Sequence, residues 1–154
     1  MTMEQDVRIL HQVPLFAQLE GEALRLLAFT AEKLSLEGNE VLFRMGEASE
    51  CSYLVTSGCI LLNGGDQNLS TGIKLSAPAL IGETALIVPT TRPGDATAME
   101  PSTLLKIPRQ LCLRIMREFP DGAARLREFM AHRLAQFTRE LDVARQRAES
   151  RAVE

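Results

Sequence analysis

The stretch that decides the fold reads Leu80-Ile81-Gly82-Glu83-Thr84-Ala85-Leu86-Ile87-Val88-Pro89-Thr90-Thr91-Arg92-Pro93-Gly94-Asp95-Ala96-Thr97-Ala98. A carboxylate, Glu83, follows a glycine directly, and a single arginine, Arg92, stands nine residues later. Residues 84–87 can form one helical turn, whose first N–H groups and partial positive charge suit an anion. Arg92 adds a guanidinium that fits phosphate oxygens in pairs, and Glu83 can accept a hydrogen bond from a sugar hydroxyl. These residues predict a small phosphorylated sugar as ligand; on spacing alone, a surface ion pair between Glu83 and Arg92 is the alternative.

Length and composition describe an ordinary globular chain. Its 154 residues suffice for one domain with a core that needs no disulfides. A net charge of −3 argues against a broad nucleic-acid-binding face, which requires clustered lysine and arginine. No apolar run is long enough to span a membrane and the N-terminus lacks the layout of a signal peptide, so we expect a cytoplasmic protein without membrane insertion. Three cysteines without a CxxC pair indicate reduced, packed thiols.

The middle of the chain carries short strand signals separated by glycine turns. Residues 51–56 and 59–62 flank Ser57-Gly58, which is the pattern of a β-hairpin. Residues 63–66, Asn-Gly-Gly-Asp, predict a tight turn before another strand over 69–75. Further strands are expected at 33–36, 41–44, 95–100 and 102–107. Strands spaced by about ten residues favour an all-β barrel or roll.

Helical patterns stand on both sides of this region. Amphipathic helices are expected over 4–13 and 22–29, and Pro108 suits the first turn of a helix over 109–119. Pro120 ends that helix, and Asp121 is a good N-cap for a last helix to about Ser150. The sequence thus predicts one domain over 1–154, with N-terminal helices in 1–30, a β-roll in 31–107 and C-terminal helices in 108–150.

The last predicted helix carries a heptad seam. Apolar residues step by four and three at Met130, Leu134, Phe137, Leu141, Ala144 and Ala148. A helix of this length cannot lie on one small domain throughout, so its second half requires a partner. We therefore expect a homodimer through Leu134, Phe137 and Leu141; the alternative is a solvated tail.

The opening stretch resembles a known cassette. Gly82-Glu83-Thr84-Ala85-Leu86-Ile87, followed by Thr91-Arg92 and Ala96-Thr97-Ala98, is similar to the phosphate-binding cassette of cyclic nucleotide-binding domains. That family includes the bacterial catabolite activator protein, regulatory subunits of the cyclic AMP-dependent kinase and cyclic nucleotide-gated channels. The resemblance implies a mainly β fold, an antiparallel double-stranded β-helix (a jelly-roll-like β-roll) with N-terminal helices and a long C-terminal helix. It implies 3′,5′-cyclic AMP or cyclic GMP as the ligand.

The same resemblance assigns roles by position. It implies that Arg92 pairs with the cyclic phosphate, that Glu83 takes the ribose 2′-hydroxyl, and that backbone donors come from residues 82–85, which are Gly82, Glu83, Thr84 and Ala85. In the catabolite activator protein a threonine-serine pair on the long helix reaches the base. Phe137-Thr138 falls at that place here, so Thr138 is the candidate base contact, from its own or the partner chain.

One departure from the family pattern falls on the site. Pro93 stands where the family's residue donates its backbone N–H to the phosphate, and proline has none. A lost donor to a charged group costs about 1.5–3 kcal/mol. Asp95 also adds an acid near the expected anion.

The resemblance to the cassette and the departures at Pro93 and Asp95 leave two hypotheses. The first is a regulatory module that binds a cyclic nucleotide and couples occupancy to its dimer helix and an unidentified downstream protein. The second is a dimerising protein-interaction module that has lost nucleotide binding. Neither a nucleophile–base pair nor a metal cluster is evident, so we expect no enzyme, no metal and no cofactor beyond the cyclic nucleotide ligand. The sequence shows no helix-turn-helix module, so we expect no direct DNA binding, in a stand-alone sensor or a piece of a larger protein.

Overall fold

The computed structural model describes residues 2–64 and 72–153, and beyond Gln136 it describes the side chains of Arg139, Val143, Gln146 and Arg147 alone. The chain begins with α1 (Met3–Gln12), the 3-10 turn η1 (Phe16–Gln18) and α2 (Gly21–Thr30). The strands are β1 (Glu32–Leu36), β2 (Val41–Phe43), β3 (Ala48–Ser49), β4 (Cys51–Ser57), β5 (Cys59–Gly64), β6 (Ile73–Ser76), β7 (Ala79–Ile81), β8 (Thr90–Thr91), β9 (Gly94–Ala98) and β10 (Ser102–Pro108). A second 3-10 turn, η2 (Glu83–Leu86), lies between β7 and β8, and the chain closes with α3 (Arg109–Glu118) and α4 (Pro120–Val153).

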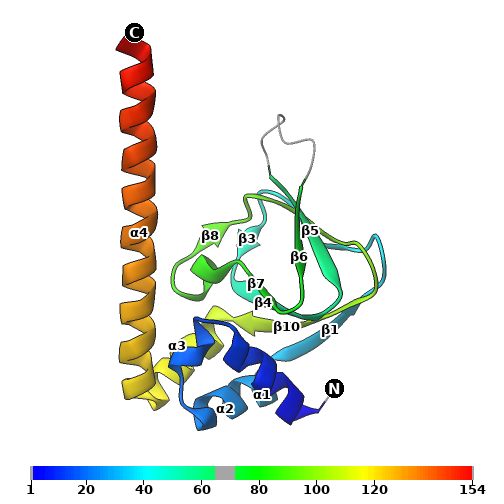
Figure 1. Ribbon diagram of the computed structural model, residues 1–154. Helices are drawn as coiled ribbons and strands as arrows, with labels where there is room; N and C mark the ends of the chain where they lie inside the picture. Colours follow the sequence, from blue (N-terminus) through cyan, green and yellow to red (C-terminus); the bar gives the residue numbers. More distant parts are fainter. Residues whose placement is uncertain (1, 65–71, 154) are drawn as a thin grey trace.

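The strands form an antiparallel roll of two four-stranded sheets. One sheet has the order β1-β10-β4-β7 and the other β2-β9-β5-β6, while β3 and β8 pair separately. In both sheets every neighbour is antiparallel. Strand β4 lies inside its sheet and is buried on both faces from Cys51 to Thr56, including the hydroxyl side chains of Ser52 and Thr56. The predicted fold class is confirmed: a mainly β roll with flanking helices and a long C-terminal helix (Figure 1).

The predicted hairpin over residues 51–62 is wrong. Strands β4 and β5 follow each other in sequence but belong to different sheets, so Gly58 joins the two sheets instead of turning the chain back. Gly58 has φ +92°, and a Cβ there would stand 2.2 Å from the Ser102 hydroxyl oxygen. Glycine is required for this crossing, and the β-rich runs on each side find their partners far away in the sequence.

The turn expected at residues 63–66 is displaced. Asn63 and Gly64 extend β5, where they pair with Asp95 and Gly94 of β9. The rest of that turn, and the first half of the strand expected over 69–75, lie outside the described residues. The described strand there is β6, which pairs with β5.

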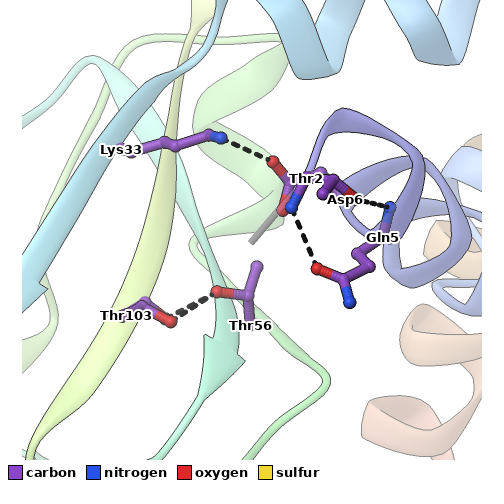
Figure 2. A network of polar contacts seen from close by, with 6 residues as sticks. All are labelled: Thr2, Gln5, Asp6, Lys33, Thr56 and Thr103. Carbon is purple, nitrogen blue, oxygen red and sulfur yellow. Dashed lines mark hydrogen bonds and ion pairs between the residues drawn. The ribbon is translucent and has the colours of Figure 1, made fainter.

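Helix α1 is capped at its start and tied to the roll. The Thr2 hydroxyl accepts a hydrogen bond from the Gln5 backbone, and the Gln5 side chain accepts one from the Thr2 backbone, which forms a capping box. One turn later the fully buried Asp6 carboxylate lies 3.2 Å from the Lys33 ammonium of β1 (Figure 2). This ion pair offsets part of the desolvation of Asp6 and fixes α1 against β1.

Helix α4 begins one residue earlier than expected. Pro120 is its first residue, so Asp121 lies in the first turn rather than at the N-cap. The helix has 34 residues, which corresponds to about 51 Å. Its base packs on η1 and α3, and the remainder runs past one side of the roll, where Arg133 contacts η2 (Figure 1). Within the described part of the chain, no helix is both long enough and apolar enough to cross a membrane.

Two apolar clusters hold the molecule together. The larger lies between the N-terminal helices, α3, the base of α4 and one face of β4 and β10; the other fills the roll between the two sheets. Leu54 of β4 points into the first cluster and Val55 into the second. The three cysteines are free thiols, and burial raises the pKa of the Cys112 thiol to about 11, which is consistent with an inert packed role.

Candidate functional site

Gly82 places η2 against the arginine of the opening stretch. It has φ +76° and ψ 42°, a left-handed conformation that L side chains adopt rarely. A Cβ at this position would stand 2.5 Å from Nη1 of Arg92. The Ser52 hydroxyl donates to the Gly82 carbonyl at 2.6 Å and holds the turn on β4. Glycine is therefore needed both for the backbone conformation and for the close approach of Arg92.

Arg92 is a buried cation that is already in position. Only 4% of it is exposed. Its Nη2 donates to the Cys51 carbonyl at 2.8 Å, and its guanidinium stacks 4.3 Å from the ring centroid of Phe43 and 5.4 Å from that of Tyr53. No carboxylate lies within ion-pair distance of it among the residues that the structure describes. A desolvated cation without an anion beside it is costly, so this geometry suits an anionic ligand.

The aromatic wall beneath Arg92 is neutral. The rings of Phe43 and Tyr53 are stacked with their centroids 6.1 Å apart. Burial, together with the hydrogen bond to Cys51, raises the pKa of the Tyr53 phenol. Tyr53 therefore presents an uncharged ring face to the guanidinium, as cation–π contact requires.

Beside Arg92 lies a cavity of about 300 Å³. Its walls include Phe43, Leu62, Ile73, Ile81, Pro93 and Asp95. This volume is at the lower end of the range for small-molecule sites, and the mixture of apolar walls with one convergent cation is typical of them.

The two residues that depart from the family pattern both line this cavity. Pro93 offers no N–H to a ligand. One carboxylate oxygen of Asp95 accepts a hydrogen bond from the Met45 backbone at 2.7 Å, which anchors the loop after β2. The ion pair between Asp95 and Arg92 that would neutralise both is not among the contacts of the described residues.

Glu83 faces away from that cavity. Its two carboxylate oxygens accept hydrogen bonds from Nη1 of Arg133 on α4, at 2.8 and 2.7 Å. The Glu83 side chain is 25% exposed and that of Arg133 53%. Arg133 also lies over the ring of Phe129, 5.6 Å from its centroid. Glu83 thus lines a second hollow of about 590 Å³ between η2 and α4, together with Thr84, Ile87, Val88, Met130 and Leu134.

The structure therefore divides the predicted site. Gly82, Arg92 and Pro93 share the inner cavity, whereas Glu83 and Thr84 line the outer hollow. The expectation that Glu83 and Arg92 converge on one concave spot is not met, because Arg133 holds the carboxylate toward α4. The Ala85 amide is already used, since it donates to the Gly82 carbonyl at 3.0 Å. Thr138, Phe137 and Leu141 lie on the α4 backbone, but their side chains are outside the described residues.

Two arginines in this region were missed by the sequence reasoning. Arg133 holds Glu83, and Arg109 braces η2 by donating to the Ala85 carbonyl and to the Ser49 carbonyl, each at 2.7 Å. Arg133 stands three residues after Met130, on the same helical face, which is a signal that could have identified it. Arg109 sits at the junction of β10 and α3, where only tertiary contacts reveal its role.

Comparisons with known proteins match the fold of this chain. The family model described as "Cyclic nucleotide-binding domain" matches residues 33–119, which is more than half of the chain. A cyclic AMP receptor protein from Thermus thermophilus is 32% identical over 135 residues, covering 84% of this chain and 61% of that protein. A cyclic nucleotide-binding-like protein of known structure from Brucella abortus is 38% identical, with a TM-score of 0.66, and the match covers 73% of this chain and 97% of that one.

A much larger enzyme contains a similar segment. The lysophospholipase of Neurospora crassa is 28% identical over 111 residues, which is 71% of this chain. This chain spans only 7% of the length of that enzyme.

Proposed function

This chain belongs to the cyclic nucleotide-binding domain family, and on that premise we propose that it is a regulatory module that binds cyclic AMP or cyclic GMP. The observation that supports this most is Arg92, a buried guanidinium beside a cavity and without a carboxylate partner among the described residues. A cyclic phosphate would supply the missing anion and accept two hydrogen bonds from the guanidinium. The backbone at Gly82 and η2 would approach the same phosphate closely because Gly82 has no side chain.

In this proposal Glu83 takes the ribose 2′-hydroxyl, and to do so it must leave Arg133. The Glu83–Arg133 pair is partly exposed, and exposed ion pairs contribute roughly 0–1 kcal/mol. Release of Glu83 is therefore an inexpensive step. Release of Glu83 would also remove the ion pair that connects η2 to α4. Ligand binding in the cavity would therefore change how α4 contacts the roll. Coupling of this kind requires a contact that differs between the two states, and this ion pair is the one we assign.

The output of the module is proposed to be a non-catalytic change in a dimer. Leu134 lines the outer hollow but is still 66% exposed, and a leucine this exposed at a seam position suits contact with a second copy of the chain. Phe137 and Leu141 continue the same seam in sequence, and Thr138 is the proposed contact to the base. We infer a homodimer through these residues and an unidentified downstream protein that reads the position of α4.

Thermal unfolding with each nucleotide tests ligand binding. A ligand at a hundred times its dissociation constant adds about 2.7 kcal/mol of stability, which raises Tm by several degrees. We expect such a shift with cyclic AMP or cyclic GMP, and its loss in Arg92→Ala. Arg25→Ala, an exposed change on α2, is the control and should leave the shift intact. A shift that persists in Arg92→Ala would remove the phosphate role from Arg92.

A second candidate function is a dimerising interaction module that binds no nucleotide. Three observations favour it: Glu83 is held in a different hollow from Arg92, Pro93 lacks a donor, and Asp95 adds an acid to the cavity. If neither nucleotide moves Tm at millimolar concentration while the dimer persists, this function replaces the first.

Sedimentation tests the dimer seam separately. Leu134→Asp places a charge on the seam and should convert a dimer to monomers. Val143→Asp is the matched control, because Val143 is also exposed on α4 but lies about half a turn away from the seam. Equal masses for both variants would eliminate the seam as the interface.

A further inference from the structure

Most arginines at the corner between α3 and α4 already have partners. Arg114 pairs with Glu118 at 3.0 Å, Arg125 with Glu20 at 3.1 Å, and Arg133 with Glu83 at 2.7 Å. The Arg109 side chain donates to two backbone carbonyls. These four side chains are accounted for by contacts within the chain.

Arg117 and Arg127 are different. Both are exposed, and neither makes an ion pair or a side-chain hydrogen bond with any residue in the described part of the chain. They come from different helices, α3 and α4, and they line the same hollow of about 580 Å³. Two uncompensated cations converging on one depression form a local positive site on a chain whose net charge is −3.

The floor of this hollow is apolar. Leu113 and Met116 of α3 line it, and Leu113 is 42% exposed. Gln110, Leu113 and Arg117 recur at three- and four-residue spacing, so they form one outward stripe of α3, while Leu111, Cys112 and Ile115 on its other side are buried. Arg127 also lines the outer hollow beside η2, so the surface continues toward Val88 and Leu134.

We propose that this α3–α4 corner, defined by Leu113, Met116, Arg117 and Arg127, is a docking site for an acidic amphipathic helix of a partner protein. The leucine and methionine would receive the apolar face of that helix, and the two arginines would pair with carboxylates on its flanks. A nucleic acid would use the arginines but would gain nothing from the apolar floor. The site shares no lining residue with the cavity of Arg92, so the proposal does not rest on the proposed phosphate site.

Fluorescence anisotropy with a defined probe tests the proposal. The probe is a labelled helical peptide with leucines on one face and glutamates beside them; a second peptide carries lysines in place of the glutamates. We expect the acidic peptide alone to bind, more weakly as salt rises. Arg117→Glu combined with Arg127→Glu should weaken binding at least tenfold, and Leu113→Asp should do the same by disrupting the floor.

The control carries the same change of charge elsewhere. Arg25→Glu combined with Arg139→Glu, both at exposed positions outside the hollow, should leave binding unchanged. Chemical-shift changes in the labelled protein should centre on Leu113, Met116, Arg117 and Arg127. The proposal is overturned if neither peptide binds, if both bind equally, or if a DNA duplex binds with the same dependence on the two arginines. It is also overturned if the Arg117→Glu/Arg127→Glu variant changes the sedimentation mass of the free protein, since a second copy would then be the occupant.

Discussion

The inner cavity beside Arg92 and the outer hollow beside Glu83 are lined by consecutive residues, Gly82 for the first and Glu83 for the second, and they are built differently. The inner cation is 4% exposed and is held by two aromatic faces and a backbone carbonyl. The outer carboxylate is held by a single half-exposed arginine on a helix that leaves the roll. The first is fixed by the packed core, and the second depends on one exchangeable contact.

This difference separates recognition from response. A rigid, buried guanidinium is prepared for an anion and loses little entropy on binding it. A weak surface ion pair can exchange partners and so can report whether the cavity is occupied. In the proposed module, the buried Arg92 therefore binds the ligand, and the exchangeable Glu83–Arg133 ion pair transmits the signal.

Truncation of the two charged residues gives the largest expected contrast. Arg92→Ala should weaken cyclic nucleotide binding by roughly thirtyfold or more, because truncating a buried charge partner costs about 2–5 kcal/mol. Glu83→Gln should weaken it by about tenfold or less, since it affects a neutral hydroxyl contact. Calorimetric titration of both variants measures the ratio. Equal losses of affinity would mean that the two residues act as one site, which would contradict the separate roles of Arg92 and Glu83.

The backbone between the two hollows should be intolerant of a single methyl group. Gly82→Ala adds a Cβ that meets Arg92 at 2.5 Å in a left-handed conformation, and we expect a loss of about 1–3 kcal/mol in the free energy of unfolding. Gly21→Ala is the control, because nothing lies within 4 Å of a Cβ there. Urea unfolding should show no loss for the control. Equal stability of both variants would show that η2 can shift freely.

Alkaline titration measures the ionisation of Tyr53, which packs beneath Arg92 of the inner cavity. Tyr53 is the only tyrosine of the chain, so tyrosinate absorbance reports this residue directly. Because burial raises its pKa above the ordinary value of 10.0, the Tyr53 phenol of the native protein should still be protonated at pH 10. The linked stability is fully present below pH 10 and is lost as pH rises through the higher folded-state pKa. If tyrosinate formed near pH 10 while the protein stayed folded, the Tyr53 phenol would be exposed to solvent and not buried.

Removal of the outer ion pair should have the smallest effect and the opposite sign. Arg133→Ala frees Glu83, so nucleotide affinity should rise by up to about fivefold, equivalent to roughly 1 kcal/mol. The wild-type protein should show part of the same gain at high salt, which screens the pair. Arg139→Ala, farther along α4, serves as the control. A fall in affinity would mean that Arg133 supports the bound state instead.

Sequence patterns anticipated the elements better than their partners. The alternation and glycine turns between residues 31 and 107 indicated a β-roll, and the bounds of the helices were close to those observed. The hairpin at Ser57-Gly58 was wrong because a glycine turn specifies that the chain bends but not toward which sheet. That choice depends on strands elsewhere in the chain, because β4 pairs with β7 and β10 whereas β5 pairs with β6 and β9.

For the site, the sequence determined which chemical groups are available: two carboxylates, one guanidinium, a permissive glycine and a proline without a donor. These follow from residue type alone. Only the tertiary structure decided that Arg92 is buried among rings while Glu83 turns to Arg133, because both environments are made by strands and helices distant in sequence. Local pattern fixes what a side chain can donate or accept, whereas packing fixes which way it faces and what surrounds it.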